Sequence, residues 1–158
     1  MKEIQLTQGK VALVDAEDFE RLNCFKWYAS KYSDGFYAMR CGFTVDGKRK
    51  TIYMHREIMN TPYDMDTDHI NYNGLDNRKK NLRNATRSEN NQNRRYAHKD
   101  NKLGIKGVRW HTQRKKFTAQ IQVKKKKIHL GCFNVLGDAD SAYRKAEEKY
   151  FREFARCN

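Results

Sequence analysis

Apolar residues in the first 60 positions form short runs separated by turn-forming residues. The run Val11-Ala12-Leu13-Val14 predicts a buried strand, and residues 15–22 predict a short helix with Asp15 as its N-cap. Further strands are expected at residues 27–29, 36–39, 43–45 and 51–53, with turns at Ser33-Asp34-Gly35 and Asp46-Gly47. A helix at residues 55–59 should end before Pro62, because proline resists helix continuation.

The pattern changes after residue 106 to alternating strands and one final helix. Strands are expected at residues 107–111, 116–124 and 128–133, and the run of lysines at 124–127 should form a hairpin tip. In the second strand, Phe117, Ala119, Ile121 and Val123 share one face, and Lys116, Thr118, Gln120, Gln122 and Lys124 share the other. A helix at residues 138–154 should cover the apolar face with Ala139, Ala142, Tyr143, Ala146 and Tyr150.

These elements predict an α+β protein with two small domains. The first, residues 1–97, should be a small β-rich region that leads into a strand–loop–strand–helix unit. Residues 98–106 are polar and are expected to be a linker. The second domain, residues 107–158, should be a three-stranded antiparallel sheet packed on one helix.

Composition supports two modest cores and an anionic partner. Only 38% of the 158 residues are hydrophobic, and the mean hydropathy is −1.04. The formal net charge of +14 favours nucleic acid, whose phosphates attract Lys and Arg. An acidic membrane is less favoured, because no long apolar run, signal peptide or lipidation motif is present. A merely solubilising charge excess is the third interpretation.

The four cysteines give no sign of a structural zinc site. Cys24, Cys41, Cys132 and Cys157 form no C-x-x-C pair. Reduced, mostly buried thiols in a cytoplasmic protein are therefore expected.

The candidate chemistry lies between residues 68 and 90. Asn73-Gly74 and Asp76-Asn77 predict a tight loop between two short strands, and Thr86 with Glu89 matches a capping box at the start of a helix that continues through Arg95. A hard divalent cation needs oxygen ligands, which Asp68 and the helical Asn90 can supply. His69 is suited to accept a proton from water, and Asn81 is placed to hydrogen-bond across the loop.

Each of these residues has a plain structural interpretation as well. An isolated Asp-His pair is more often a surface turn than a metal site, and Asn-rich loops are common. Adjacent residues of a strand point to opposite sides, so Asp68 and His69 need a twisted strand end or a bulge to reach one phosphate. The combination of Asp68, His69, Asn81 and Asn90, and not any one of them alone, indicates a metal site.

The spacing from His69 to Asn81 and from Asn81 to Asn90 resembles the phage and intron-associated branch of the HNH nucleases. The segment Asn81 to Asn90 is similar to the signature of that branch, and the resemblance covers residues 55–93. It implies a ββα-metal finger with one Mg²⁺ or Mn²⁺ per active site, held by Asp68 and Asn90. It also implies His69 as general base and Asn81 as loop organiser. His55-Arg56 resembles the segment that precedes the signature in this branch. Two roles are open for it, a phosphate contact by Arg56 and a packing role for His55.

The polar sheet face of the second domain is the candidate DNA-binding surface. A β-ribbon fits the major groove, where Arg and Gln make bidentate base contacts, although an exposed antiparallel face is polar in any case. Residues 104–155 resemble the Apetala-two-type domain of plant ethylene-response factors through Gly107-Val108-Arg109, Trp110 and Leu130-Gly131-Cys132-Phe133. The resemblance implies that the sheet reads double-stranded DNA. The expected contact residues are Arg109, Trp110, Arg114, Lys116, Thr118, Gln120 and Gln122.

The sequence therefore predicts a metal-dependent DNA endonuclease that is targeted by its second domain and acts as a monomer or weak dimer. A non-catalytic DNA-binding regulator that keeps an HNH-like fold is the alternative. An RNA-binding protein of ribosomal type would account for the charge but not for the set Asp68, His69, Asn81 and Asn90.

Overall fold

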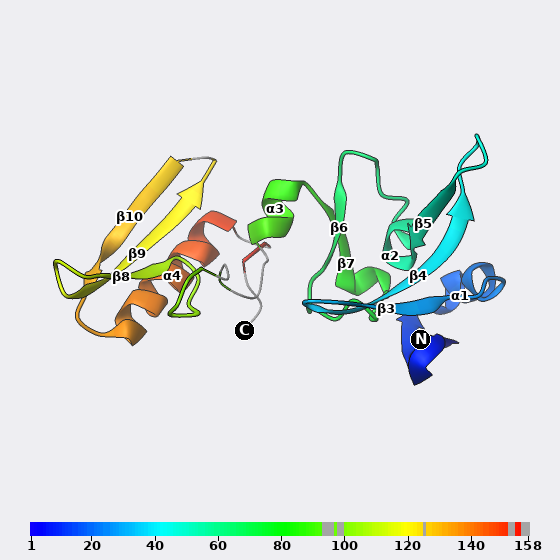
Figure 1. Cartoon of the computed structure of the whole chain (residues 1–158), viewed down its shortest axis with the longest axis horizontal. Coiled ribbons are helices and arrows are strands. Elements are labelled where there is room, and N and C mark those ends of the chain that lie inside the picture. The colour runs from blue at the N-terminus through cyan, green and yellow to red at the C-terminus, as the bar shows by residue number, and fades with distance from the viewer. Residues whose placement is uncertain (93–96, 98–99, 125, 152–153, 156–158) are drawn as a thin grey trace. The chain divides into compact units, whose positions relative to one another are not determined.

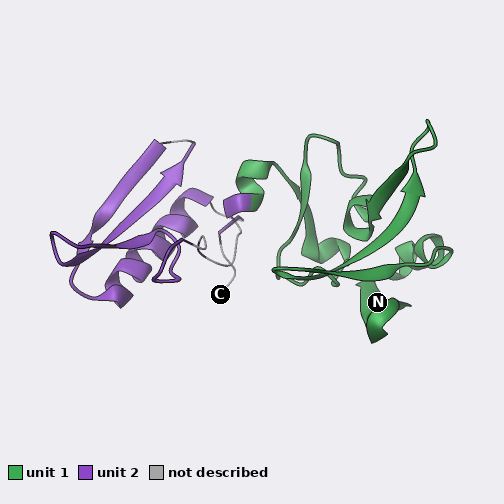
Figure 2. Cartoon of the chain, in the orientation of Figure 1, with its two compact units in different colours: residues 1–90 green, residues 91–158 purple. Residues whose placement is uncertain are grey.

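Small antiparallel sheets and short helices follow one another along the chain in the computed structural model (Figure 1). The structure describes residues 1–92, 97, 100–124, 126–151 and 154–155. It divides into two units, Met1–Asn90 and Asn91–Asn158, each with its own core (Figure 2). The expected α+β class is confirmed at this level. The assignment of a nuclease role to one unit and a DNA-targeting role to the other stays a prediction.

Unit 1 begins with a two-stranded sheet and a helix. The elements are β1 (Lys2–Gln5), η1 (Thr7–Gly9), β2 (Val11–Val14) and α1 (Ala16–Asn23). Asp15 stands at the N-cap of α1 as expected, but its side chain makes no capping hydrogen bond. It accepts a hydrogen bond from the backbone N–H of Lys79 at 2.7 Å instead. The carboxylate thus ties the start of α1 to a distant loop.

A three-stranded sheet and a short helix complete the scaffold of unit 1. The elements are β3 (Tyr28–Tyr32), β4 (Gly35–Phe43), β5 (Arg49–Tyr53) and α2 (Met54–Ile58), with sheet order β3-β4-β5. Both expected turns are present, although β4 ends at Phe43 and the second turn spans residues 44–48. Leu22, Trp27 and Met54 form the buried centre of the core, where the Trp27 indole N–H donates to the Leu22 carbonyl at 2.8 Å.

The strand–loop–strand–helix order expected around the Asp-His pair is present. The elements are β6 (Asp66–His69), η2 (Lys79–Asn81), β7 (Leu82–Ala85) and α3 (Arg87–Gln92). Strands β6 and β7 pair antiparallel with His69 opposite Leu82 and Asp68 opposite Arg83. The expected continuation of the helix through Arg95 lies outside the described residues.

Unit 2 contains the expected sheet with one helix across it (Figure 1). The elements are β8 (Val108–His111), β9 (Lys116–Val123), β10 (Lys126–Phe133) and α4 (Leu136–Phe151), with sheet order β10-β9-β8. Lys126 and Lys127 belong to β10 and not to the hairpin tip, and Lys125 lies outside the described residues. The pairing of β9 with β10 shifts register between His129 and Gly131.

Helix α4 covers the sheet with most of the side chains that its periodicity indicates. Ala139, Tyr143 and Ala146 are buried, whereas Tyr150 is 38% exposed and Phe151 is buried instead. Glu147 is also buried and pairs with Lys106 at 2.8 Å, so the end of the helix turns partly toward the segment before β8. Leu103 and Ile105, within the expected linker, pack against the same core.

Two further expectations concern thiols and membranes. Cys24, Cys41 and Cys132 are free, but Cys24 and Cys41 are exposed rather than buried, and Cys157 lies outside the described residues. Among the helices that the structure describes, none has the length and apolar character needed to cross a bilayer.

Candidate functional site

Asn81 organises the loop between β6 and β7. Its side chain is buried, with the amide Nδ2 donating to the Asp76 carbonyl at 2.7 Å and Oδ1 accepting from the Asn71 backbone N–H at 3.0 Å. The backbone N–H of Ile70 donates to the Asn81 carbonyl at 2.9 Å. One side chain therefore closes the loop from both ends, which is the role expected for Asn81.

The same loop is fixed to the scaffold of unit 1 by backbone contacts. The Leu13 N–H donates to the Leu75 carbonyl, and the Asn77 N–H donates to the Leu13 carbonyl, both at 2.8 Å. A Cβ on Gly74 would lie 2.5 Å from the Phe36 carbonyl oxygen, so the loop lies directly against β4. The β-rich region that precedes the Asp-His pair thus positions it, which the sequence pattern did not reveal.

Asp68 lies in an ion pair on one face of the hairpin. Its carboxylate is 7% exposed and accepts from the Arg83 guanidinium through Nε at 2.9 Å and Nη2 at 2.7 Å. Arg83 stands opposite Asp68 in the register of β6 and β7, which accounts for the contact. The guanidinium neutralises the buried charge of the carboxylate.

Asp66 and Asn90 lie on the face that carries Asp68. Alternation along β6 puts the side chains of residues 66 and 68 on the same side. The Nδ2 of Asn90, in α3, donates to Asp66 Oδ2 at 3.3 Å. Asp66 was not among the expected site residues. Its position two residues before Asp68 on a strand is the signal that could have identified it.

The capping box at the start of α3 is present and confirms the prediction. The Thr86 backbone N–H donates to Glu89 Oε2 at 2.8 Å, and the Glu89 N–H donates to Thr86 Oγ1 at 3.3 Å. The hydrogen bonds from Thr86 lower the pKa of Glu89, so the carboxylate is charged near neutral pH. This cap fixes the first turn of α3, from which Asn90 projects.

His69 points to the opposite side of β6 from Asp68. It is 6% exposed, and its Nε2 lies 3.2 Å from Asn77 Oδ1. Burial lowers the pKa of His69, while the hydrogen bond to Asn77 and nearby carboxylates act in the other direction. The pairing of β6 with β7 is regular up to His69 and Leu82, so the strand has no bulge that would bring His69 beside Asp68.

His69 belongs to an aromatic cluster that the scaffold supplies. The His55 ring lies 4.9 Å from the His69 ring, and Tyr37 lies 5.7 Å from His69, both edge to face. Burial lowers the pKa of His55 to about 3. The cluster confirms the packing interpretation of His55, and it keeps both imidazoles neutral near pH 7.

Arg56 supports the segment between α2 and β6. Its guanidinium donates through Nη1 to the Met65 carbonyl at 2.8 Å and through Nη2 to the Pro62 carbonyl at 2.9 Å. In this structure the side chain thus holds the backbone ahead of Asp66, a role different from the expected phosphate contact.

The donors near Asp68 suit a hard cation in their chemistry. Two carboxylates and one amide, those of Asp66, Asp68 and Asn90, all offer oxygen, which Mg²⁺ and Mn²⁺ prefer. Within the described ranges, no cluster of three or more His, Cys, Asp or Glu side chains is formed, so the amide is needed to complete a set of three.

The polar face of the unit 2 sheet gathers six of the seven expected DNA-contacting residues around one surface. Strand register places Arg109 opposite Thr118, and alternation along β9 places Lys116, Gln120 and Gln122 on the same face. Lys127 stands opposite Gln122, and His129 opposite Gln120. Arg114, from the β8–β9 turn, reaches the Cys132 thiol at 3.7 Å. The sequence pattern placed Lys127 at a hairpin tip, where it could contact phosphate, and it did not single out His129; the structure places both in β10.

Trp110 is the exception in this set. It stands opposite Phe117 in the register, on the apolar face, and the two rings lie 4.8 Å apart. The indole is nevertheless 46% exposed, because β8 is the edge strand of the sheet. Trp110 therefore borders the sheet edge and does not lie on the polar face.

No family model, curated protein or solved structure matches this chain.

Proposed function

We propose that the protein is a metal-dependent DNA endonuclease of the HNH type, with the site on β6, β7 and α3. The observation that carries the proposal is the convergence of Asp66, Asp68 and Asn90 on one face of the hairpin, at the end of which His69 stands. A loop closed by Asn81 and attached to β2 and β4 follows β6, the strand that carries Asp66 and Asp68. Oxygen donors on one side of the strand end and a neutral imidazole on the other suit phosphodiester hydrolysis.

His69 would act as the general base. Its lowered pKa keeps the imidazole unprotonated near pH 7, so that it can accept the proton of a water molecule. The water oxygen then forms a bond to phosphorus, and one P–O ester bond breaks. Because His69 is the last residue of β6, a phosphate bound across the strand end would meet the imidazole on one side and the carboxylates on the other.

Asp66, Asp68 and Asn90 would hold the metal. When bound, a divalent cation supplies charge to polarise the phosphate and to stabilise the leaving oxygen. Arg83 would share Asp68 with the cation, since its guanidinium already contacts Oδ2. Asn90 would present its amide oxygen, while its Nδ2 keeps the contact with Asp66.

Unit 2 would bind double-stranded DNA through its polar sheet face. Arg109, Gln120 and Gln122 offer bidentate base contacts, and Lys116 and Lys127 offer phosphate contacts. The net charge of +14 supports a polyanionic partner.

The direct experiment measures nicking of supercoiled plasmid with Mg²⁺ or Mn²⁺. We expect His69→Ala to reduce nicking by about 100-fold or more, the contribution typical of a general base, while duplex binding in a gel shift is unchanged. His129→Ala, which removes an exposed histidine of unit 2, is the matched control and should not alter the chemical step. A His69→Ala protein that is folded by circular dichroism and nicks at the wild-type rate would refute the assignment.

Metal binding is tested separately by Mn²⁺ titration followed by electron paramagnetic resonance. Asp66→Asn and Asp68→Asn should each weaken Mn²⁺ binding, because each removes one anionic oxygen ligand. Asp46→Asn, at an exposed turn of the same unit, should leave it unchanged. Equal Mn²⁺ affinity in all three variants would contradict the metal site.

A non-catalytic DNA-binding protein is the second candidate. It is favoured by the Asp68–Arg83 ion pair and by the position of His69 on the opposite face, buried against Tyr37 and His55. For this function, plasmid would stay intact with every divalent metal while the duplex gel shift is retained.

A further inference from the structure

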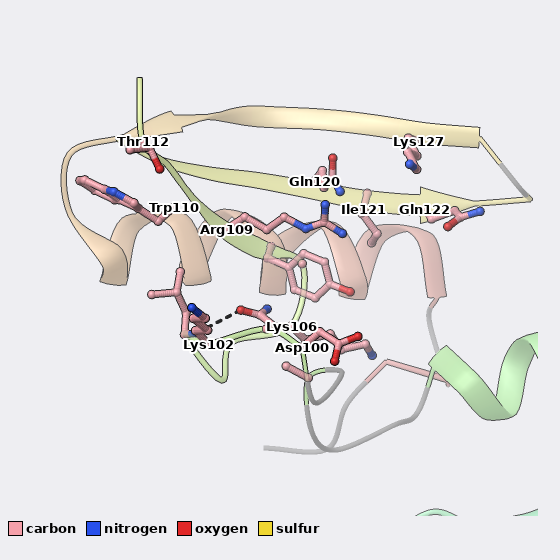
Figure 3. Close-up of a pocket in the computed structure, with 15 residues that line it drawn as sticks. Asp100, Lys102, Lys106, Arg109, Trp110, Thr112, Gln120, Ile121, Gln122 and Lys127 are labelled. Atoms are coloured by element: carbon pink, nitrogen blue, oxygen red, sulfur yellow. Dashed lines mark hydrogen bonds between the residues drawn. The ribbon is translucent and has the colours of Figure 1, made fainter. Parts of the chain in front are cut away.

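A pocket lies at the edge of the unit 2 sheet, beside the part of β9 that extends past the first residue of β8. The pairing of the two strands ends at Val108 and Ala119, and β9 continues to Val123. The segment of residues 100–106 forms the facing wall, opposite Arg109, Gln120 and Gln122 (Figure 3). The pocket, called the edge notch below, has a volume of about 900 Å³. This is within the range of sites that hold small organic groups.

The walls of the edge notch are basic. Lys102, Lys106, Arg109 and Lys127 line it, and Asp100 is the one carboxylate among the lining residues. Lys106 is already committed to Glu147 and to the Gln92 carbonyl. In the described part of the chain, no ion pair engages Lys102, Arg109 or Lys127. Three cations therefore remain to attract an anionic ligand.

Aromatic rings complete the edge notch. Trp110 lines it and is 46% exposed, and the buried Tyr143 also lines it. A basic groove with an accessible aromatic ring is the combination that binds single-stranded nucleic acid, in which phosphates pair with cations and bases stack on rings. The polar side chains of Gln120 and Gln122 add hydrogen-bonding groups.

Shape distinguishes the edge notch from the polar face. A β-sheet face can enter the major groove, which is about 12 Å wide, because the sheet projects into it. A concave pocket cannot enter a groove, and an intact double helix is too thick to enter the pocket. Unstacked nucleotides are narrow enough to enter the pocket, and their exposed bases can stack on an aromatic ring.

We propose that the edge notch binds a short segment of single-stranded DNA beside the duplex bound by the polar face, with which the notch shares Arg109, Gln120, Gln122 and Lys127. This inference rests on the proposed function, since it takes DNA as the partner. Strand opening or an extruded nucleotide beside the bound duplex would supply the segment.

The test uses the full chain and fluorescein-labelled oligo(dT), with a labelled duplex measured in parallel by fluorescence anisotropy. Lys127→Ala and Lys116→Ala each remove one lysine of the sheet, but only Lys127 lines the edge notch. We expect Lys127→Ala to weaken oligo(dT) binding and to reduce its salt dependence by about 0.7 in log–log slope, the value for one phosphate of a single strand. Lys116→Ala should weaken only duplex binding.

Trp110 provides a second readout. Trp27 is 4% exposed, so stacking of a base on Trp110 should quench only part of the tryptophan emission. Unlabelled oligo(dT) is expected to quench the wild type and not Trp110→Leu, and the leucine variant should bind oligo(dT) about 5- to 150-fold more weakly.

Three results would overturn the inference. The first is oligo(dT) binding that Lys127→Ala and Lys116→Ala weaken equally, and the second is wild-type affinity in a folded Trp110→Leu protein. The third is preferential binding of oligo(U), which would replace DNA by RNA as the ligand. None of these depends on cleavage. A failure of the nuclease proposal would instead appear as intact plasmid with oligo(dT) binding unchanged.

Discussion

The imidazoles of His55 and His69 lie side by side in the interior of unit 1, where the two residues are 7% and 6% exposed. Burial lowers the pKa of both, to about 3 for His55. In the unfolded chain each histidine titrates near pH 6.5. Below that pH the unfolded chain takes up protons that the folded chain does not, so the stability of unit 1 is full above pH 6.5 and falls as the pH drops toward 3.

We therefore expect the free energy of unfolding of unit 1 to fall by about 1 kcal/mol per pH unit for His55 between pH 6 and pH 4. His55→Phe should flatten this dependence, because it removes the group that the unfolded chain protonates. Urea unfolding at three pH values, followed by the fluorescence of Trp27 in a Trp110→Leu background, measures it. His129→Phe, at an exposed histidine of unit 2, should keep the wild-type slope, and an equal slope in His55→Phe would contradict the assignment.

Gly107 decides how β8 meets the helix of unit 2, at the scale of the element. Its φ is +73°, and a Cβ there would lie 1.9 Å from Cε2 of Tyr143 and 2.7 Å from the Gln120 carbonyl oxygen. The Gln120 N–H donates to the Gly107 carbonyl at 2.9 Å. Tyr143 can pack against the start of β8 only because this residue lacks a side chain.

Gly107→Ala should destabilise unit 2 by about 1–3 kcal/mol or more through overpacking, with additional strain from the positive φ. Gly104→Ala is the matched control: its φ is +67°, but nothing lies within 4 Å of an added Cβ. Thermal unfolding followed by Trp110 fluorescence should show a larger drop in stability for Gly107→Ala than for Gly104→Ala. Equal drops would mean that backbone strain alone, and not contact with Tyr143, requires the glycine.

The formal charge of +14 matters at the scale of the whole molecule because it favours DNA association before any specific contact forms. Basic residues occur on both sides of unit 2, including Arg144 and Lys145 on α4 and Arg114 and Lys116 at the β8–β9 hairpin. Only the hairpin residues lie by the polar face. The position of the basic residues, and not their number, should therefore determine the affinity for duplex DNA.

The double variant Arg114→Ala/Lys116→Ala should weaken duplex binding and lower the log–log salt slope by up to about 2, close to 0.9 for each phosphate that is no longer neutralised. Arg144→Ala/Lys145→Ala removes the same two residue types from α4 and should change the slope little. Anisotropy titrations at four salt concentrations measure both slopes. Equal slopes in the two variants would show that net charge alone drives binding.

Local signals in the sequence sufficed wherever neighbouring residues decide the conformation. The hairpin turns, the capping box of Thr86 and Glu89, and the alternation of residues 116–123 all depend on contacts within a few positions, and each is present. The role of Asn81 as loop organiser was implied by the resemblance to the HNH branch, and its side chain does hydrogen-bond to Asn71 and Asp76 across the loop.

The remaining features of the fold and the candidate site depend on contacts between segments that are distant in the sequence. Asp15 bonds Lys79 in place of its own helix, Leu13 pairs with the loop of the candidate site, and His69 packs on Tyr37 and His55. Alternation along β6 puts Asp66 on the face of Asp68, the contact with Asp66 adds Asn90 of α3, and pairing with Phe117 puts Trp110 on the apolar face. The sequence by itself determined the elements and the oxygen and imidazole donors. Only the tertiary structure decided which donors share a face, because that depends on long-range pairing and packing that no local pattern encodes.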